Sequence, residues 1–221
     1  PGRVIRPPAT EPEAAPWRAR TIADVLDELR LAADPVERPF LLAVDGRQGG
    51  GQTSMAGRFA ALVPGTMGDH TDDEGWWESF FGWDELMLEG ILEPLHRGET
   101  VDYRPPAWES RGREGSIAVP ATAPMVVFEG VGISRRSLGP LFDASVWVQS
   151  DFDDANRRGI ERQGGSQAET DFWWEWDREE QPFLAADRPW ERADVIVCGA
   201  PYLVEVEYDP ASEVLVGTRH E

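Results

Sequence analysis

The sequence contains no lysine. All 21 basic residues are arginine, and 41 acidic residues bring the formal net charge at pH 7 to −20. So acidic a chain argues against general binding to nucleic acid or to an anionic membrane, because both carry negative charge. A local cationic pocket for one small phosphate ligand is still compatible with this charge. We therefore expect a small-molecule substrate as the partner and leave open whether the chain forms a homodimer.

Cysteine and long apolar runs are also scarce. The only cysteine, Cys198, excludes an intrachain disulfide, and its apolar context "ADVIVCG" predicts a buried strand residue rather than a nucleophile. No apolar run approaches the roughly 18 residues of a membrane span, and the first residues lack the apolar segment of a secretion signal. These absences predict a cytoplasmic protein.

What the sequence does contain predicts a single folded domain. The chain has 221 residues, 41% of them hydrophobic and ten of them tryptophan, which is enough for a large core. Residues 1–20 are rich in proline and predict an extended arm, which leaves residues 21–221 as one domain. Buried strands alternate with helical segments, which predicts an α/β fold with a parallel, doubly wound sheet. The clearest strands are "PFLLAVDG", "PMVVFEGVG", "DASVWVQS" and "ADVIVCGAP", and "LVEVEYDP" with "EVLVG" predicts a closing hairpin or edge pair.

A glycine-rich turn follows the first buried strand, in the stretch "AVDGRQGGGQTSMAGRF". Gly46, Gly51 and Thr53 fit the spacing of a phosphate-binding loop between a strand and a helix. Such a loop turns its backbone N–H groups and the helix N-terminus toward a phosphate, and Thr53 is placed to bind Mg²⁺. The position that carries lysine in such loops holds Gln52. Because the whole chain lacks lysine, the sequence does not separate a compositional cause from a functional one. The other residues expected to contact the cofactor here are Arg47, Gly49, Gly50 and Ser54.

The order of motifs beyond this loop resembles the uridine kinase-like branch of the P-loop small-molecule kinases. The resemblance covers roughly residues 40–199, and the matching pieces are "VDGRQGGGQTS", "HTDD", "SFFGWDEL", "YRPPAW", "VVFEGVG", "VWVQSD", "RRGIER" and "FLAADRPWERADVIV". It implies a P-loop NTPase-like fold with a five-stranded parallel core sheet between helices, an arginine lid at about residues 151–166 and a C-terminal strand pair. It also implies ATP, or another NTP, and Mg²⁺ as cofactors.

The resemblance also implies roles for individual residues. Asp72 or Asp73 in "HTDD" would be the general base that accepts the proton of the substrate hydroxyl. Glu129 would hold Mg²⁺ together with Thr53. The lid arginines that would cover the phosphates are Arg157, Arg158 and Arg162, and the residues at the position of substrate recognition are Tyr103, Arg104 and Arg111.

Aromatic residues are dense after the acidic pair and again near residue 175. The first group is Trp76, Trp77, Phe80, Phe81 and Trp83. The helical spacing of Trp76, Phe80 and Trp83 favours core packing, and the others would form a wall for a flat or apolar acceptor. The residues of this group that we expect among the substrate contacts are Trp76, Trp77 and Phe80. Trp173, Trp174 and Trp176 cannot share one helix face. Core and surface packing is the simpler interpretation for these three, with a ligand or partner contact as the alternative for one of them.

The missing lysine is the weak point of a kinase interpretation. At about 4 Å and an effective dielectric near 20, the lost Coulomb energy is on the order of 4 kcal/mol, or roughly three powers of ten in rate. Arginine would have to replace it, and the candidates are Arg47, Arg135, Arg136 and the lid arginines. Three hypotheses remain: a kinase that transfers phosphate from ATP to a hydroxyl of a nucleoside-like or other metabolite, a kinase-derived nucleotide-binding protein without turnover, and an enzyme that uses the fold for non-kinase chemistry. The carboxylates at positions 72, 73 and 129 favour the first two, Gln52 favours the last two, and we favour the kinase.

Overall fold

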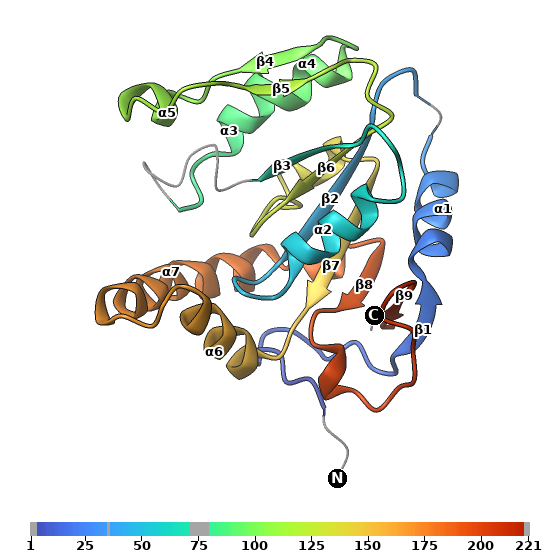
Figure 1. Ribbon diagram of the computed structural model, residues 1–221, viewed down its shortest axis with the longest axis vertical. Coiled ribbons are helices and arrows are strands. Elements are labelled where there is room, and N and C mark those ends of the chain that lie inside the picture. Colours follow the sequence, from blue (N-terminus) through green and yellow to red (C-terminus); the bar gives the residue numbers. More distant parts are fainter. Residues whose placement is uncertain (1–3, 35, 71–79, 219–221) are drawn as a thin grey trace.

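The computed structural model describes residues 4–34, 36–70 and 80–218, and its centre is a mostly parallel sheet (Figure 1). Seven strands pair in the order β1-β9-β8-β7-β2-β6-β3. The strands are β1 (Arg18–Thr21), β2 (Phe40–Gly46), β3 (Met67–His70), β6 (Met125–Glu129), β7 (Ala144–Gln149), β8 (Val195–Cys198) and β9 (Glu213–Val216). The five from β8 to β3 are parallel, which confirms the predicted core sheet.

The edge beyond β8 differs from the sequence prediction in one detail. β9 pairs antiparallel with β8 on one side and with β1 on the other, where Arg18 lies opposite Val216. The segment 203–210, which alternates apolar and polar residues, contains no strand and begins in the short 3₁₀ helix η5 (Pro201–Leu203). Its apolar residues Val204, Val206 and Tyr208 pack against the core instead. The alternating pattern therefore arises because one side of this segment is buried, not because the segment pairs with another strand.

Helices cover both faces of the sheet because successive residues of the buried strands point to opposite sides. Leu42 and Val44 of β2 pack under α1 (Ile22–Ala32) and α2 (Gln52–Ala60). Leu41 and Ala43 pack on the other face against a helical segment composed of α3 (Asp84–Met87), the π-helical turn η2 (Leu88–Leu92) and α4 (Glu93–His96). The helical spacing of Leu88, Ile91, Leu92 and Leu95 in the sequence agrees with this segment.

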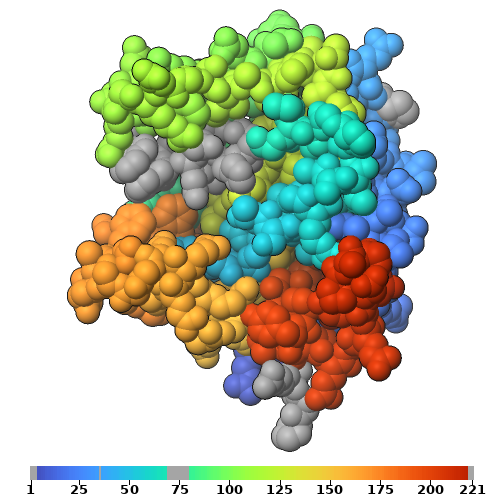
Figure 2. All heavy atoms as spheres, in the orientation of Figure 1, coloured from blue at the N-terminus to red at the C-terminus, as the bar shows by residue number. Residues whose placement is uncertain are grey.

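A two-stranded antiparallel sheet lies outside the main sheet. β4 (Val101–Tyr103) pairs with β5 (Ile117–Val119), and α5 (Pro106–Ser110) lies between them in the chain. The sequence of this region, "VDYRPPAWESRGREG", is rich in proline and arginine. Figure 2 shows this green region and the orange helices α6 (Phe152–Arg162) and α7 (Gln167–Asp187) as two projections on the same side of the molecule.

The proline-rich segment before β1 packs into the protein. Ile5, Ala14 and Trp17 are buried in a third core cluster together with Trp147 of β7 and Cys198 of β8. Burial raises the pKa of the Cys198 thiol to about 12, which fits a strand residue in the core rather than a nucleophile. The remaining elements are the 3₁₀ turns η3 (Gly139–Leu141) and η4 (Pro189–Glu191). Among the described residues, no helix combines the length and apolar character needed to cross a bilayer.

Candidate functional site

The glycine-rich turn is a tight loop between the end of β2 and the start of α2, as the sequence predicts. Gly51 is the N-cap of α2 with φ of +105°, a conformation that favours glycine. The loop closes on itself through Gly50, whose N–H donates to the Arg47 carbonyl at 2.8 Å. A side chain at Gly49 would lie 2.7 Å from the Ala155 carbonyl oxygen of α6, so this position accepts only glycine without rearrangement. The loop therefore has the backbone geometry of an anion cradle at a helix N-terminus.

Gln52 lies inside this cradle. Its side chain is only 8% exposed, and its Oε1 lies 3.6 Å from the place where a Cβ on Gly46 would be. The carboxamide thus folds back over the loop toward the end of β2. It offers hydrogen bonds to a ligand but no formal charge.

Thr53 and Glu129 meet beside the loop. Glu129 is buried at the C-terminal end of β6, next to β2 in the sheet, and the Thr53 hydroxyl donates to its Oε1 at 2.9 Å. Oxygen ligands of this kind suit Mg²⁺, which is normally held by one or two carboxylates, water and substrate phosphates. The described residues contain no group of three or more acidic, histidine or cysteine side chains that would hold a metal without such a ligand. The pair fits a magnesium ion that arrives with a nucleotide.

A cavity of about 260 Å³ opens over the loop. One side of it is polar and comes from the loop, the start of α2 and the end of β6, and the other side is an aromatic wall formed by Phe172, Trp173 and Trp176 of α7. The lining residues are Gln48, Gly49, Gly51, Gln52, Thr53, Ser54, Glu129, Gly130, Val131, Arg162, Gln163 and these three aromatic residues. The fold therefore joins most of the expected loop residues, the expected metal pair and one lid arginine in a single cavity.

The three tryptophans of α7 have three different environments. Trp173 is buried, and its indole N–H donates to Asn156 of α6 at 2.8 Å. Trp174 is 39% exposed, while Trp176 lines the cavity with its ring edge-on to Phe80 at a centroid distance of 4.9 Å. Phe80 therefore supports the aromatic wall, and two of the three tryptophans reach the cavity.

The lid arginines lie on α6 and differ in their contacts. Arg157 is exposed and pairs with Asp154 and Glu161 of its own helix. Arg158 pairs with Asp154 at 2.8 Å and also donates to the Gly49 carbonyl of the loop at 3.4 Å. Arg162 lines the cavity. Helix α6 thus brings Arg158 to the loop and Arg162 to the cavity.

The arginine inside the loop points away from the cavity. Arg47 is 3% exposed, and its Nε donates to Glu11 of the N-terminal segment at 2.9 Å. Its guanidinium also lies over the Trp190 ring at 5.5 Å from the centroid. The interpretation of Arg47 as the replacement for lysine gains no support, because its charge is already paired in the core.

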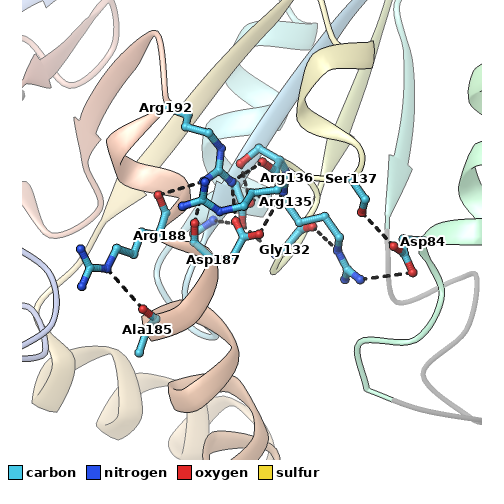
Figure 3. Close-up of polar contacts among 12 residues, drawn as sticks. Asp84, Gly132, Arg135, Arg136, Ser137, Ala185, Asp187, Arg188 and Arg192 are labelled. Carbon is cyan, nitrogen blue, oxygen red and sulfur yellow. Dashed lines mark hydrogen bonds and ion pairs between the residues drawn. The ribbon is translucent and has the colours of Figure 1, made fainter.

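The arginines after β6 are also engaged elsewhere. Arg135 is buried against the rings of Trp83 and Phe183, and it donates to the carbonyls of Gly132 and Phe81. Burial lowers its pKa, an effect opposed by the nearby carboxylates of Asp84, Asp45 and Asp187. Figure 3 shows Arg192 and the Arg136 N–H meeting at Asp187, where the Arg136 N–H donates to Oδ2 at 2.9 Å, while the Arg135 guanidinium extends toward Asp84. None of these arginines lines the cavity over the loop.

Several expected substrate residues lie elsewhere or outside the described residues. Tyr103 lines a separate cavity beside Gly90, and Arg104 donates to the Arg113 carbonyl at 2.7 Å. Arg111 ends α5, in the same outer layer. The structure does not place these three in the cavity over the loop. Asp72, Asp73, Trp76 and Trp77 lie outside the described residues, which resume at Phe80; β3 ends at position 70, opposite Glu129 in the sheet register.

Two buried carboxylates at the loop were missed from the sequence. Asp45 accepts hydrogen bonds from the N–H groups of Gly46 and Gly132 at 2.8 Å and from Ser134, and it joins the loop to the segment after β6. Burial raises its pKa, and these hydrogen bonds oppose the increase. Glu180 of α7 accepts the N–H of Gln48. An acidic residue in the apolar strand "FLLAVDG" could have signalled Asp45, whereas Glu180 lies in an acidic helix and carries no such signal.

Comparison with known proteins shows the fold. No protein-family model matches the sequence, and no curated protein matches it either. Among solved structures, the chain is similar to one described as a candidate uridine kinase from Bacillus stearothermophilus, with 20% identity and a TM-score of 0.50 over 78% of this chain and 95% of that one. It is also similar to one described as a candidate fructose transport system kinase from Silicibacter sp. TM1040, with 18% identity and a TM-score of 0.53 over 79% of this chain and 95% of that one. At this identity the likeness establishes a P-loop kinase fold, a mixed α/β sheet flanked by helices.

Proposed function

We propose that this protein transfers a phosphoryl group from ATP, or another NTP, to the hydroxyl of a small molecule, with Mg²⁺ as the metal cofactor. The observation that carries the proposal is the contact of 2.9 Å between the Thr53 hydroxyl and the Glu129 carboxylate beside a glycine-rich loop. A scaffold without a nucleotide has no need for a carboxylate buried at the end of β6 next to a helix N-terminus. The kinase descriptions of the similar structures agree with this chemistry.

Each part of the cavity has a role in the proposed reaction. The loop N–H groups and the N-terminus of α2 bind the phosphate oxygens, while Thr53 and Glu129 hold the metal. When bound, Mg²⁺ neutralises charge that develops on the transferred group. The α7 aromatic wall excludes water on the opposite side. The sequence resemblance adds Asp72 or Asp73 as the base that takes the proton of the acceptor hydroxyl.

Arg162 is our proposal for the cation that compensates for Gln52. It lines the cavity, whereas Arg47 and Arg135 are fixed in the core. Arginine can bind two phosphate oxygens at once, and its delocalised charge suits a phosphoryl group. Arg158 would assist by holding the loop at Gly49.

The acceptor is proposed to be nucleoside-like or another metabolite with an apolar or flat part. The aromatic wall at Trp176, supported by Phe80, gives such a part a surface to pack on. Trp76, Trp77, Tyr103, Arg104 and Arg111 stay proposals for acceptor binding, carried by the sequence resemblance alone.

The second candidate function is nucleotide binding without turnover, and the observation that favours it is the neutral side chain of Gln52 in the cradle. Non-kinase chemistry in the same fold is the third hypothesis, and no contact among the described residues of the cavity favours it. A protein of the second kind would bind Mg·ATP and leave it intact, and one of the third kind would not bind it.

Calorimetric titration with ATP, with and without Mg²⁺, tests the nucleotide- and metal-binding part of the proposed function. We expect binding that strengthens at least tenfold when Mg²⁺ is present, and a Glu129→Gln variant that loses most of this strengthening because one metal oxygen is replaced. Glu89→Gln, on an exposed part of the helical segment, is the matched control and should behave as wild type. Absence of ATP binding in both conditions would overturn the proposal, and so would a Glu129→Gln variant with the full metal dependence.

A further inference from the structure

Helix α7 places a carboxylate directly against the phosphate loop. Both side-chain oxygens of Glu180 lie 3.2 Å from the backbone nitrogen of Gln48, the second residue of the loop. Glu180 is 2% exposed, so the contact is inside the protein. A loop that binds anions through its backbone N–H groups therefore already gives one of them to an internal anion.

The same carboxylate also holds the aromatic wall. The indole N–H of Trp176, one helical turn earlier, donates to Glu180 Oε2 at 2.9 Å. Trp176 in turn lines the cavity and packs against Phe80 and Phe81. Glu180 thus connects the two sides of the cavity, the loop and the wall, through one side chain.

Within the described part of the chain, no cation forms an ion pair with Glu180. Arg47 is the nearby cation, but its Nε is paired with Glu11. Asp177, on the preceding turn of α7, adds a like charge. Among the described residues, those that line this space from the residue after β7 and from α6 are uncharged: Ser150, Phe152, Ala155 and Asn156.

Burial has the largest effect on the pKa of the Glu180 carboxyl. It raises the pKa of Glu180 to about 7, against the opposing effects of Arg47, the Trp176 indole and the Gln48 N–H. The group therefore changes from neutral to charged near neutral pH. Because Glu180 lies 3.2 Å from the loop, this change alters the charge next to the cradle.

We propose that Glu180 is a positioning residue that holds the first turn of the phosphate loop and the Trp176 wall together, and that its negative charge weakens the binding of polyphosphate to that loop. The second half rests on the proposed function. A bound polyphosphate adds negative charge beside the carboxylate, so binding raises the pKa of Glu180 further and takes up a proton. Affinity for polyphosphate must then fall as pH rises through 7.

The first half is tested without nucleotide. The indole proton resonance of Trp176, assigned by its loss in Trp176→Phe, should titrate with a midpoint near pH 7 in the wild-type protein. Glu180→Gln keeps the size and the hydrogen-bond acceptor but removes the charge, so the titration should disappear. Glu179→Gln, its exposed neighbour on α7, should keep it. A wild-type resonance that does not titrate, or a titration that survives in Glu180→Gln, overturns this half.

The second half is tested with Mg·ATP at saturating Mg²⁺. If binding raises the pKa by about one unit, the wild-type Kd should increase about fivefold from pH 6 to pH 8. Glu180→Gln should show no such increase relative to the ligand's own titration, and at pH 8 it should bind about fivefold more tightly than wild type. Glu179→Gln should follow wild type.

A second variant keeps the proposal testable if Glu180→Gln does not fold. Trp176→Phe removes a hydrogen bond that favours the charged carboxylate, so the midpoint of the change in Kd should move to higher pH. Equal pH dependence in wild type and Glu180→Gln, or an unmoved midpoint in Trp176→Phe, overturns the proposed effect of charge. Failure of the wild-type protein to bind Mg·ATP at either pH overturns the proposed function together with this half, while the indole titration decides the first half separately.

Discussion

The arginines near the phosphate loop fall into two groups, those fixed in the core and those on the lid helix α6. Arg47 belongs to the loop by sequence, yet its side chain is buried against Glu11 and Trp190. Arg162 is more than a hundred residues away in the chain, yet it lines the cavity. The difference teaches that a cation inside a motif can serve the scaffold while a distant one lies at the cavity. In a chain without lysine, both positions are filled by residues of one type.

Removal of Arg47 should have the largest effect, on stability. Arg47→Ala leaves Glu11 buried and charged, with only the neutral donors Trp147 and Gln149 around it. Breaking a buried ion pair in this way costs about 3–5 kcal/mol. Urea denaturation should show the loss as a lower midpoint, and Arg157→Ala, on the exposed face of α6, should leave the midpoint unchanged. If Arg47→Ala had the wild-type midpoint, Arg47 would not stabilise the fold, and the contrast between core arginines and those on α6 would be wrong.

Gly159 tests how α6, which carries the other group, is held in place. A Cβ at this position would lie 1.8 Å from Trp173, whose ring also packs against Gly49 of the loop. Gly159→Ala should therefore lower the free energy of unfolding by about 1–3 kcal/mol, the usual cost of overpacking. Gly57→Ala, in helix α2 with open space around it, should instead be neutral or stabilising by up to roughly 1 kcal/mol. Equal effects of the two substitutions in thermal or urea unfolding would show that Trp173 does not fix the lid.

Arg162→Ala should have the smallest effect on the fold and a selective one on binding. We expect the Kd for Mg·ATP to increase about tenfold, the worth of one charge-assisted contact, with no change in the unfolding midpoint. Calorimetry on Arg162→Ala and Arg157→Ala distinguishes the effect of a position in the cavity from the effect of losing one positive charge, because both variants remove one arginine of α6 and only Arg162 lines the cavity. If the two variants bind equally well, the lid arginines are not a ligand-binding group and the contrast with Arg47 disappears.

The sequence predicts the parts of the site that are local in the chain. The strand, the glycine turn and helix α2 form one continuous stretch, and Gly51 and Thr53 lie in it at the spacing of a phosphate-binding loop. Four of the five parallel strands are equally visible, because each is a short apolar run between turn residues; the fifth, β3 with the sequence MGDH, is not such a run, and a five-stranded sheet was expected only from the family resemblance. The contact of Thr53 with Glu129 follows once those strands are placed side by side.

Long-range partners could not be predicted in the same way. Arg47 pairs with Glu11, which lies in a segment whose prolines suggest only an extended arm. Glu180 is one of several acids in α7, and nothing local distinguishes it from the exposed Glu179. The pairing of β1 with β9 depends on which edge of the sheet is free, and that is a property of the whole topology.

The contact between Gln181 of α7 and Arg47 spans 134 residues, and Gln149 reaches Glu11 across 138. Such contacts form only after a large part of the chain has been brought together, and they make folding slow. We therefore expect the phosphate loop, although it is encoded in fewer than a dozen consecutive residues, to be anchored only after these distant segments have docked. A chain that has formed its central strands but not yet docked its first and last segments would carry the loop sequence without the anchored loop. The capacity to bind a ligand there would then report complete folding of the protein.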